Sequence, residues 1–193
     1  MEIYLIRHTA PKVGKGICYG QTDLDIDETS FEQELNFISK SLPKDIEKYF
    51  SSPLKRCKQL AERLSPDFKV DERLVELNFG DWENKNWNEI DKTKLNEWMQ
   101  DFVNISLPNG ENYKALHLRT ENFINNVLKT DLQKIAIITH AGNIRSFLSF
   151  VLSLPLENSF RIRLDYATVV WVVVSEDDNF NQLVSIQHFK KYE

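Results

Sequence analysis

Two short apolar segments of this chain each end in a histidine, and this repeated pattern constrains the fold more than any other feature. Residues 3–6 (Ile-Tyr-Leu-Ile) lead into Arg7 and His8, and residues 135–139 (Ile-Ala-Ile-Ile-Thr) lead into His140. Continuous apolar runs of this length are typical of strands buried on both faces of a parallel sheet. Because the carboxyl ends of parallel strands line one crevice, we expect both histidines to face a common site.

Segments with helical periodicity separate the expected strands. Apolar residues recur at helical spacing over residues 30–42, 54–64, 116–128 and 144–152, with a further helix expected near 89–102. Additional strands are expected at residues 46–50, 68–71, 167–174 and 183–189. This alternation predicts an α/β fold, a three-layer sandwich with a mostly parallel central sheet, helices on both faces and a C-terminal antiparallel hairpin.

Local signals also predict where two of these helices begin. Ser30 starts the sequence S-F-E-Q, which matches a capping box for the first helix. Ser52 precedes Pro53, a residue favoured at the first helical position, so we expect Ser52 to cap the second helix. At 193 residues the chain is expected to form a single domain, residues 1–193, with a lid-like helical insertion at about 78–115.

The overall charge narrows the class of partner. A net charge of −5 argues against nucleic acid or an anionic membrane as the main partner, although a local arginine cluster could still bind a small anionic substrate. The chain shows no signal-peptide pattern and no apolar run of about 18 residues, and its two cysteines fit a reducing compartment. We therefore expect a soluble cytoplasmic protein, either a monomer or a homodimer.

An arginine and the N-termini of two expected helices indicate that the expected site binds an anion. Arg56 falls in the first turn of the second helix, and Ala141 opens the helix that follows His140. Helix N-termini favour anions, and a guanidinium matches phosphate oxygens in geometry. Taken singly, Arg7 could be a strand-end ion pair, Arg56 a solvated helix charge and His140 a core histidine. Together they predict a dianion site.

The motifs LIRH, SSPLKRCKQLA, ELNFGDWE and ITHAG occur in this order and resemble the histidine phosphatase superfamily, also called the phosphoglycerate mutase-like family. The resemblance spans the chain from the first strand to the final hairpin. It implies that His8 is a nucleophile that becomes phosphorylated, and that Arg7, Arg56 and His140 clamp the phosphoryl group. It also implies that Glu76 protonates the leaving group.

The same resemblance implies further contacts and a reaction class. Backbone N–H groups near Gly20 and at Ala141 are expected to contact the phosphoryl group. The implied enzyme is a metal-independent phosphomonoesterase that needs no cofactor. This agrees with the chemistry of phosphoryl transfer, which requires mainly alignment and neutralisation of the equatorial oxygens. A neutral imidazole can attack phosphorus, and a nearby carboxylic acid can protonate a poor alkoxide leaving group.

A narrower resemblance concerns the substrate. The segment GICYGQTDLDI, preceded by RHTAP, resembles the branch of α-ribazole-5′-phosphate phosphatases of cobalamin synthesis, and Gln21 and Thr22 fall where that branch lines the substrate entrance. The chain departs from the family at Thr9, where glycine is usual, and in THAG, where THGG is frequent. Thr9 would narrow the space beside the nucleophile. Sugar phosphates, nucleotides and other small monoesters stay open as substrates.

Two other functions are compatible with these motifs. A phosphoglycerate mutase is the nearest enzymatic alternative, and a non-catalytic binding module is an alternative of a different class. Residues Cys57 to Arg63 satisfy the Cys-x₅-Arg spacing of cysteine phosphatases, but the segment has no glycine and keeps helical periodicity. The chain lacks a P-loop, and its histidines and cysteines lack the spacing of metal ligands.

Overall fold

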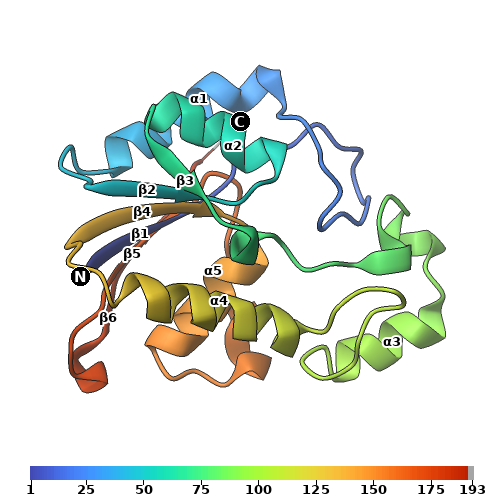
Figure 1. Cartoon of the computed structure of the whole chain (residues 1–193). Helices are drawn as coiled ribbons and strands as arrows, with labels where there is room; N and C mark the ends of the chain where they lie inside the picture. Colours follow the sequence, from blue (N-terminus) through green and yellow to red (C-terminus); the bar gives the residue numbers. More distant parts are fainter. Residues whose placement is uncertain (191–193) are drawn as a thin grey trace.

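The centre of the protein is a six-stranded sheet, seen in a computed structural model that describes residues 1–190 (Figure 1). Its order is β3-β2-β4-β1-β5-β6. The strands are β1 (Glu2–Arg7), β2 (Lys48–Ser51), β3 (Phe68–Val70), β4 (Lys134–Thr139), β5 (Val169–Val173) and β6 (Gln182–Gln187). The first four are parallel, whereas β5 and β6 form an antiparallel pair at one edge, which confirms the predicted sheet.

Helices cover both faces of this sheet. Figure 1 shows α1 (Glu28–Ser41) and α2 (Lys55–Leu64) on one face and α4 (Tyr113–Val127) and α5 (Ala141–Val151) on the other. The two resulting apolar cores take alternate residues of each central strand: Ile3 and Leu5 belong to one core, and Tyr4 and Ile6 belong to the other. This double burial explains why the central strands have continuous apolar sequences.

The segment between β3 and α4 has its own apolar cluster. It contains short 3₁₀ turns and one longer helix, α3 (Lys92–Gln100), close to the helix predicted there. Trp82 and Trp98 are buried in this cluster with their rings 5.8 Å apart, and Cys18 joins them from the loop after β1. The insertion is thereby packed against the loop that follows the first strand.

Both predicted helix caps are wrong. The first helix begins at Glu28, and the side chain of Asp27, rather than of Ser30, accepts a hydrogen bond from the backbone N–H of Thr29. The second helix begins at Lys55 with Leu54 at its N-cap, because the backbone is still extended at Leu54. The Ser52 hydroxyl lies outside the helix and accepts from the backbone N–H of Leu54 over 3.4 Å. Within residues 1–190, no helix has both the length and the apolar character needed to cross a bilayer.

Candidate active site

The two strand-end histidines lie side by side. Strands β1 and β4 are neighbours, and Arg7 at the end of β1 is in register with Thr139 at the end of β4. The next residue of each strand, His8 and His140, is buried, and the two ring centroids lie 5.1 Å apart. The structure therefore brings these residues together as the sequence pattern predicted.

Arg56 links the two imidazoles. Its guanidinium is fully buried in the first turn of α2, with Nε 3.3 Å from Nε2 of His8 and Nη2 3.2 Å from Nδ1 of His140. The remaining donors reach backbone carbonyls: Nη1 lies 2.8 Å from the oxygen of Thr22, and Nη2 lies 2.6 Å from that of Gly20. The cation is held between the histidines by neutral groups.

Hydrogen bonds define the tautomer of His8. Its Nδ1 atom lies 2.7 Å from the carbonyl oxygen of Thr9. Because a carbonyl can only accept, Nδ1 carries the proton and Nε2 keeps its lone pair, which accepts the hydrogen bond from Arg56. Burial, followed by the charges of Arg56 and Arg7, lowers the pKa of His8 well below its usual value. A neutral imidazole with a free Nε2 is the form required of a nucleophile.

His140 has the opposite tautomer. Its Nδ1 accepts from Arg56, so the proton is on Nε2, which donates to the hydroxyl of Ser52 over 2.8 Å. Burial and the Arg56 charge lower the pKa of His140 as well. The sequence interpretation treated Ser52 only as a helix cap, because serine before proline at a helix start satisfies that local rule. Its partner lies 88 residues away in the chain.

Arg7 is held by a carbonyl and an aromatic ring. Its Nη1 donates to the carbonyl oxygen of Leu164 over 2.5 Å, and its guanidinium carbon lies 4.2 Å from the centre of the Tyr166 ring. The hydroxyl of Tyr166 is hydrogen-bonded to that of Tyr19, whose ring lies 5.4 Å from the guanidinium carbon of Arg56. Neither tyrosine was predicted: Tyr19 lies within the quoted segment GICYGQTDLDI, in which only Gly20, Gln21 and Thr22 were assigned roles, and Tyr166 lies in an irregular segment without a motif.

Glu76 reaches the site from the irregular segment before the insertion. One carboxylate oxygen accepts from the N–H of Leu77 over 2.9 Å, and the other accepts from the N–H of Gly142 over 3.1 Å, in the first turn of α5. A Cβ atom on Gly142 would come within 2.2 Å of the carboxylate, so a larger residue at this position would displace the Glu76 side chain. The carboxylate is thereby tied to the helix that follows His140.

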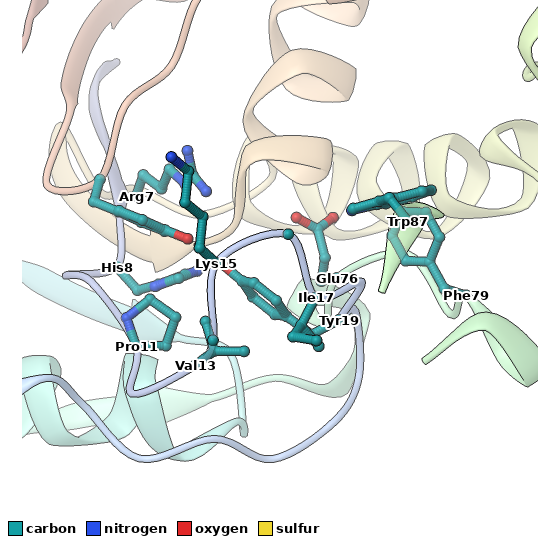
Figure 2. A pocket seen from close by; sticks show the side chains of 13 residues that line it. Arg7, His8, Pro11, Val13, Lys15, Ile17, Tyr19, Glu76, Phe79 and Trp87 are labelled. Atoms are coloured by element: carbon teal, nitrogen blue, oxygen red, sulfur yellow. The ribbon is translucent and has the colours of Figure 1, made fainter. Parts of the chain in front are cut away.

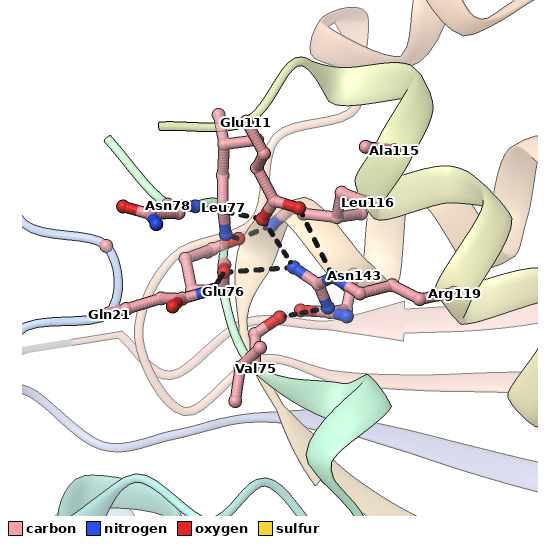
Figure 3. Close-up of polar contacts among 12 residues, drawn as sticks. Gln21, Val75, Glu76, Leu77, Asn78, Glu111, Ala115, Leu116, Arg119 and Asn143 are labelled. Carbon is pink, nitrogen blue, oxygen red and sulfur yellow. Dashed lines mark hydrogen bonds and ion pairs between the residues drawn. The ribbon is translucent and has the colours of Figure 1, made fainter. Parts of the chain in front are cut away.

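The backbone around Glu76 is fixed by Arg119 of α4 (Figure 3). The guanidinium donates to the carbonyl oxygens of Arg73, Val75 and Glu76 over 2.8, 2.5 and 3.0 Å. It also forms an ion pair of 2.8 Å with Glu111. These bonds give an otherwise irregular segment a defined course, which places the Glu76 side chain.

The family model for the histidine phosphatase superfamily (branch 1) matches residues 3–187. The chain belongs to this superfamily. It is 29% identical over 176 residues to a putative phosphoserine phosphatase 2 of Hydrogenobacter thermophilus, covering 87% of each chain. It is 23% identical over 192 residues to an adenosylcobalamin/alpha-ribazole phosphatase of Escherichia coli, covering 95% of this chain and 94% of the relative.

A solved structure extends the comparison to the fold. A putative alpha-ribazole-5′-P phosphatase from Escherichia coli superposes with a TM-score of 0.87 at 22% identity, over 97% of this chain and 96% of that chain. The α/β architecture predicted from the sequence is thus confirmed as that of the histidine phosphatases. The superfamily match and the phosphatase-named relatives identify a hydrolase of phosphate monoesters.

The site of this histidine phosphatase opens into a pocket of about 570 Å³ (Figure 2). Arg7 and His8 lie at one side of the pocket, Trp87 and Phe79 at the other, and the Glu76 carboxylate lies between them. Its lining also includes the two tyrosines, an apolar group and one further cation: Tyr19, Tyr166, Pro11, Val13, Ile17 and Lys15. The pocket therefore combines a charged end with a largely aromatic and apolar wall.

The other predicted residues, including the buried Arg56 and His140, lie beside this pocket rather than in its lining. Thr9 is fully buried, and Gln21 donates through its side-chain amide to the carbonyl oxygen of Glu76 over 3.0 Å. The hydroxyl of Thr22 is hydrogen-bonded to Glu83. Gly20 presents its carbonyl oxygen to Arg56, and Ala141 is the first residue of α5. Substrate and phosphate contacts by these residues stay predictions.

Two rival chemistries can be compared with the geometry. Cys57 is buried within α2, and burial raises the pKa of its thiol to about 12, so Cys57 is a poor nucleophile. Its segment is helical, as predicted, and does not form a phosphate-binding loop. Among residues 1–190, no three His, Cys, Asp or Glu side chains come together in a group that could hold a metal ion.

Proposed function

We propose that this protein hydrolyses small phosphomonoesters through a phosphohistidine formed on Nε2 of His8. The observation that carries the proposal is the tautomer of His8: Nδ1–H is tied to the Thr9 carbonyl, and Nε2 keeps its lone pair in a buried, cationic environment. The phosphoryl oxygens would be neutralised by Arg7, Arg56 and His140. In support, the buried Nε atom of Arg7 has no hydrogen-bond partner within residues 1–190.

The reaction has two steps. In the first, Nε2 of His8 attacks phosphorus, the bond from phosphorus to the ester oxygen breaks, and Glu76 supplies a proton to the departing alcohol. In the second, Glu76 takes a proton from water, the resulting hydroxide attacks phosphorus, and the bond to His8 breaks to release inorganic phosphate. The backbone N–H groups of Leu77 and Gly142 hold the Glu76 carboxylate beside the pocket in which the ester would lie.

We further propose α-ribazole 5′-phosphate, an intermediate of cobalamin synthesis, as the substrate. The aromatic wall formed by Phe79, Trp87 and Tyr19 suits a substrate with a planar ring, and the ring edges and faces would add to its affinity. The relative and the solved structure named as α-ribazole phosphatases support the same substrate.

A second substrate has a specific argument of its own. The relative with 29% identity is named a putative phosphoserine phosphatase, and Lys15 is a cation in the pocket lining apart from Arg7. An ammonium at this position could pair with the carboxylate of phosphoserine. Phosphoglycerate mutation, broad hydrolysis of sugar phosphates and nucleotides, and a non-catalytic binding role are the remaining alternatives.

A phosphate-release panel tests these proposals. It includes α-ribazole 5′-phosphate, phosphoserine, 3-phosphoglycerate, sugar phosphates and nucleotides, each assayed with EDTA and with added Mg²⁺. We expect hydrolysis that persists in EDTA and the highest kcat/KM for α-ribazole 5′-phosphate. Activity that appears only with a divalent ion contradicts the proposed mechanism, and isomerisation of 3-phosphoglycerate with bisphosphoglycerate identifies a mutase.

Three other proposals concern the whole molecule. We propose that residues 78–115 act as a lid over the pocket, that the chain forms a homodimer and that it is cytoplasmic. The lid proposal is supported by Phe79 and Trp87, which belong to this segment and line the pocket. Light scattering on a size-exclusion column tests the dimer.

A further inference from the structure

Glu83 holds the loop that follows the first strand. One carboxylate oxygen accepts from the N–H of Gln21 over 2.8 Å and from the N–H of Phe79 over 3.1 Å. The other accepts from the N–H of Thr22 over 2.6 Å and from the hydroxyl of the same residue. A single side chain of the insertion thus binds two successive peptide N–H groups of a distant segment, 61 and 62 residues away.

The same loop segment holds Arg56 from its other side. The carbonyl oxygens of Gly20 and Thr22 accept hydrogen bonds from Nη2 and Nη1 of Arg56 over 2.6 and 2.8 Å. The peptide unit between Gly20 and Gln21 therefore points its N–H at Glu83 and its C=O at Arg56. Hydrogen bonds in such a chain polarise one another, so a carboxylate on the N–H makes the carbonyl a stronger acceptor.

Arg56 depends on these carbonyls for its position. Within residues 1–190, no carboxylate oxygen lies within 4.0 Å of its guanidinium nitrogens, although the side chain is fully buried. Its other two contacts are the imidazoles of His8 and His140. Two backbone oxygens and two imidazoles thus orient the cation, and within residues 1–190 no carboxylate neutralises its charge.

Close packing transmits the position of the insertion to this loop. A Cβ atom on Gly20 would come within 1.9 Å of the Leu77 carbonyl oxygen and within 2.7 Å of the Phe79 ring. The loop backbone therefore lies directly against the segment that leads into Glu83, and a side chain at residue 20 would force the two apart.

We propose that Glu83 is a positioning residue of the phosphate clamp, acting on Arg56 through the backbone of residues 20–22. The inference rests on the proposed function, because it assigns Arg56 to the binding of the phosphoryl group. Among the described residues, 1–190, no cation forms an ion pair with this carboxylate, which instead fixes and polarises the peptide groups that orient Arg56. The hydrogen bonds of Glu83 go to Gln21, Thr22 and Phe79, and not to the charged residues of the pocket lining.

The test compares two glutamate variants of the insertion. Glu83→Gln keeps the side-chain shape but turns an N–H₂ group toward donors in either amide orientation. Glu89→Gln is the matched control, because Glu89 is exposed and accepts only from the backbone of Asn86, within the insertion. Orthovanadate binding is measured by calorimetry, kcat/KM with p-nitrophenyl phosphate, and folding by thermal melts.

We expect Glu83→Gln to weaken orthovanadate binding and to lower kcat/KM, each by about 10- to 100-fold, as is usual when support for an anion- or metal-binding group is removed. Glu89→Gln should change neither by more than about twofold, because it lies outside the chain of contacts that ends at Arg56. Unchanged orthovanadate affinity in folded Glu83→Gln overturns the inference, even if the melting temperature falls.

A milder variant decides the matter if Glu83→Gln does not fold. Thr22→Val removes the hydroxyl that donates to Glu83 and accepts from the side-chain amide of Asn84 over 3.3 Å, and it keeps both backbone bonds of the loop to Glu83. Orthovanadate binding should therefore weaken by about 3- to 10-fold. Wild-type affinity in that variant would refute the role of Glu83. A failure of the proposed function gives a different result: the wild-type protein itself would not release phosphate from the esters of the panel, whatever the Glu83 variants do.

Discussion

The Nε atom of Arg56 donates a hydrogen bond to the Nε2 atom of His8 over 3.3 Å. Nε2 is the proposed nucleophile, so the contact that directs its lone pair must be exchanged for a phosphoryl group when the ester binds. The guanidinium stays beside that nitrogen through its bonds to the backbone and to His140. It can therefore pass from the imidazole to a phosphoryl oxygen by a small change in direction.

Replacement of His8 by alanine should lower turnover by at least about 10³-fold, because no other group can form the covalent intermediate. Initial rates of phosphate release on the best substrate of the panel measure the effect. His117→Gln is the control, since His117 pairs with Ser146 between α4 and α5 and does not line the pocket. Near-normal turnover of His8→Ala would remove the assigned nucleophile.

Glu76→Gln should slow alkyl phosphates by about 10²–10⁴-fold, because the amide cannot donate a proton to a poor leaving group. The loss on p-nitrophenyl phosphate should be much smaller, since p-nitrophenolate departs with little protonation. The ratio of the two losses is the informative quantity. If both esters slow equally, Glu76 serves only to hold the backbone of Leu77 and Gly142.

Ser52→Ala should lower kcat/KM by about tenfold, because the tautomer of His140 would lose the acceptor of its Nε2 proton. The free energy of unfolding should fall by about 1–3 kcal/mol, since the buried N–H would lose its hydroxyl acceptor and keep the weaker sulfur acceptor of Cys57, 3.5 Å away. Ser51→Ala is the matched control: this neighbouring serine is equally buried and bonds to the Ser52 carbonyl instead. It should affect stability without the catalytic loss, and equal catalytic losses would contradict the role of Ser52.

Tyr166→Leu should weaken the binding of inorganic phosphate by about 3- to 30-fold, because the aromatic face beside the Arg7 guanidinium is removed. Tyr166→Phe keeps that face and loses only the hydrogen bond to Tyr19, so binding should change by less than about threefold. Competition by phosphate against p-nitrophenyl phosphate measures both variants. Similar weakening in the two would show that the bond between the hydroxyls, and not the ring, matters.

Acidic pH should destabilise the protein below about pH 6.5, the usual pKa of histidine. Burial and the charge of Arg56 hold the pKa of His8 and of His140 well below that value in the folded state. The unfolded chain then binds more protons as the pH falls, so the free energy of unfolding drops by up to about 1.4 kcal/mol per pH unit for each ring. More than about one pH unit above 6.5, both rings are neutral in both states and contribute no pH dependence.

Urea melts between pH 5 and pH 7.5 check this dependence in wild type and in His8→Asn. The variant should show a shallower decline on the acidic side, because one of the buried imidazoles is gone. Parallel declines in the two proteins would mean that His8 takes up its proton equally easily in the folded and unfolded states.

The strand-end part of the site was predictable because its signal is local. The continuous apolar runs before His8 and His140 indicate strands that are buried on both faces of the sheet, and parallel pairing of these strands brings their carboxyl ends together. Arg56 was predictable from its place in the first turn of a helix. The resemblance to the histidine phosphatases is the source of the role proposed for Glu76, which no periodic pattern marks.

The supporting residues were not predictable, since their roles arise from contacts between distant irregular segments. Tyr19 and Tyr166 meet across 147 residues, and Glu83 meets Thr22 across 61. Ser52 was wrongly assigned as a helix cap for the same reason. The local sequence matches a capping pattern, but the fold places His140, which follows β4, within hydrogen-bond distance of the Ser52 hydroxyl. Sequence periodicity indicates which faces of helices and strands are buried, and it carries no information about contacts between distant irregular segments.

The third apolar cluster shares no buried member with the two cores of the sheet. Phe79 and Trp87, which pack against this cluster, also form the outer wall of the pocket. Exchanges of aromatic side chains there can alter which alcohol is accepted while the machinery at the strand ends stays intact. Substrate selectivity can therefore change between related proteins through substitutions in this cluster, without loss of stability in the two cores of the sheet.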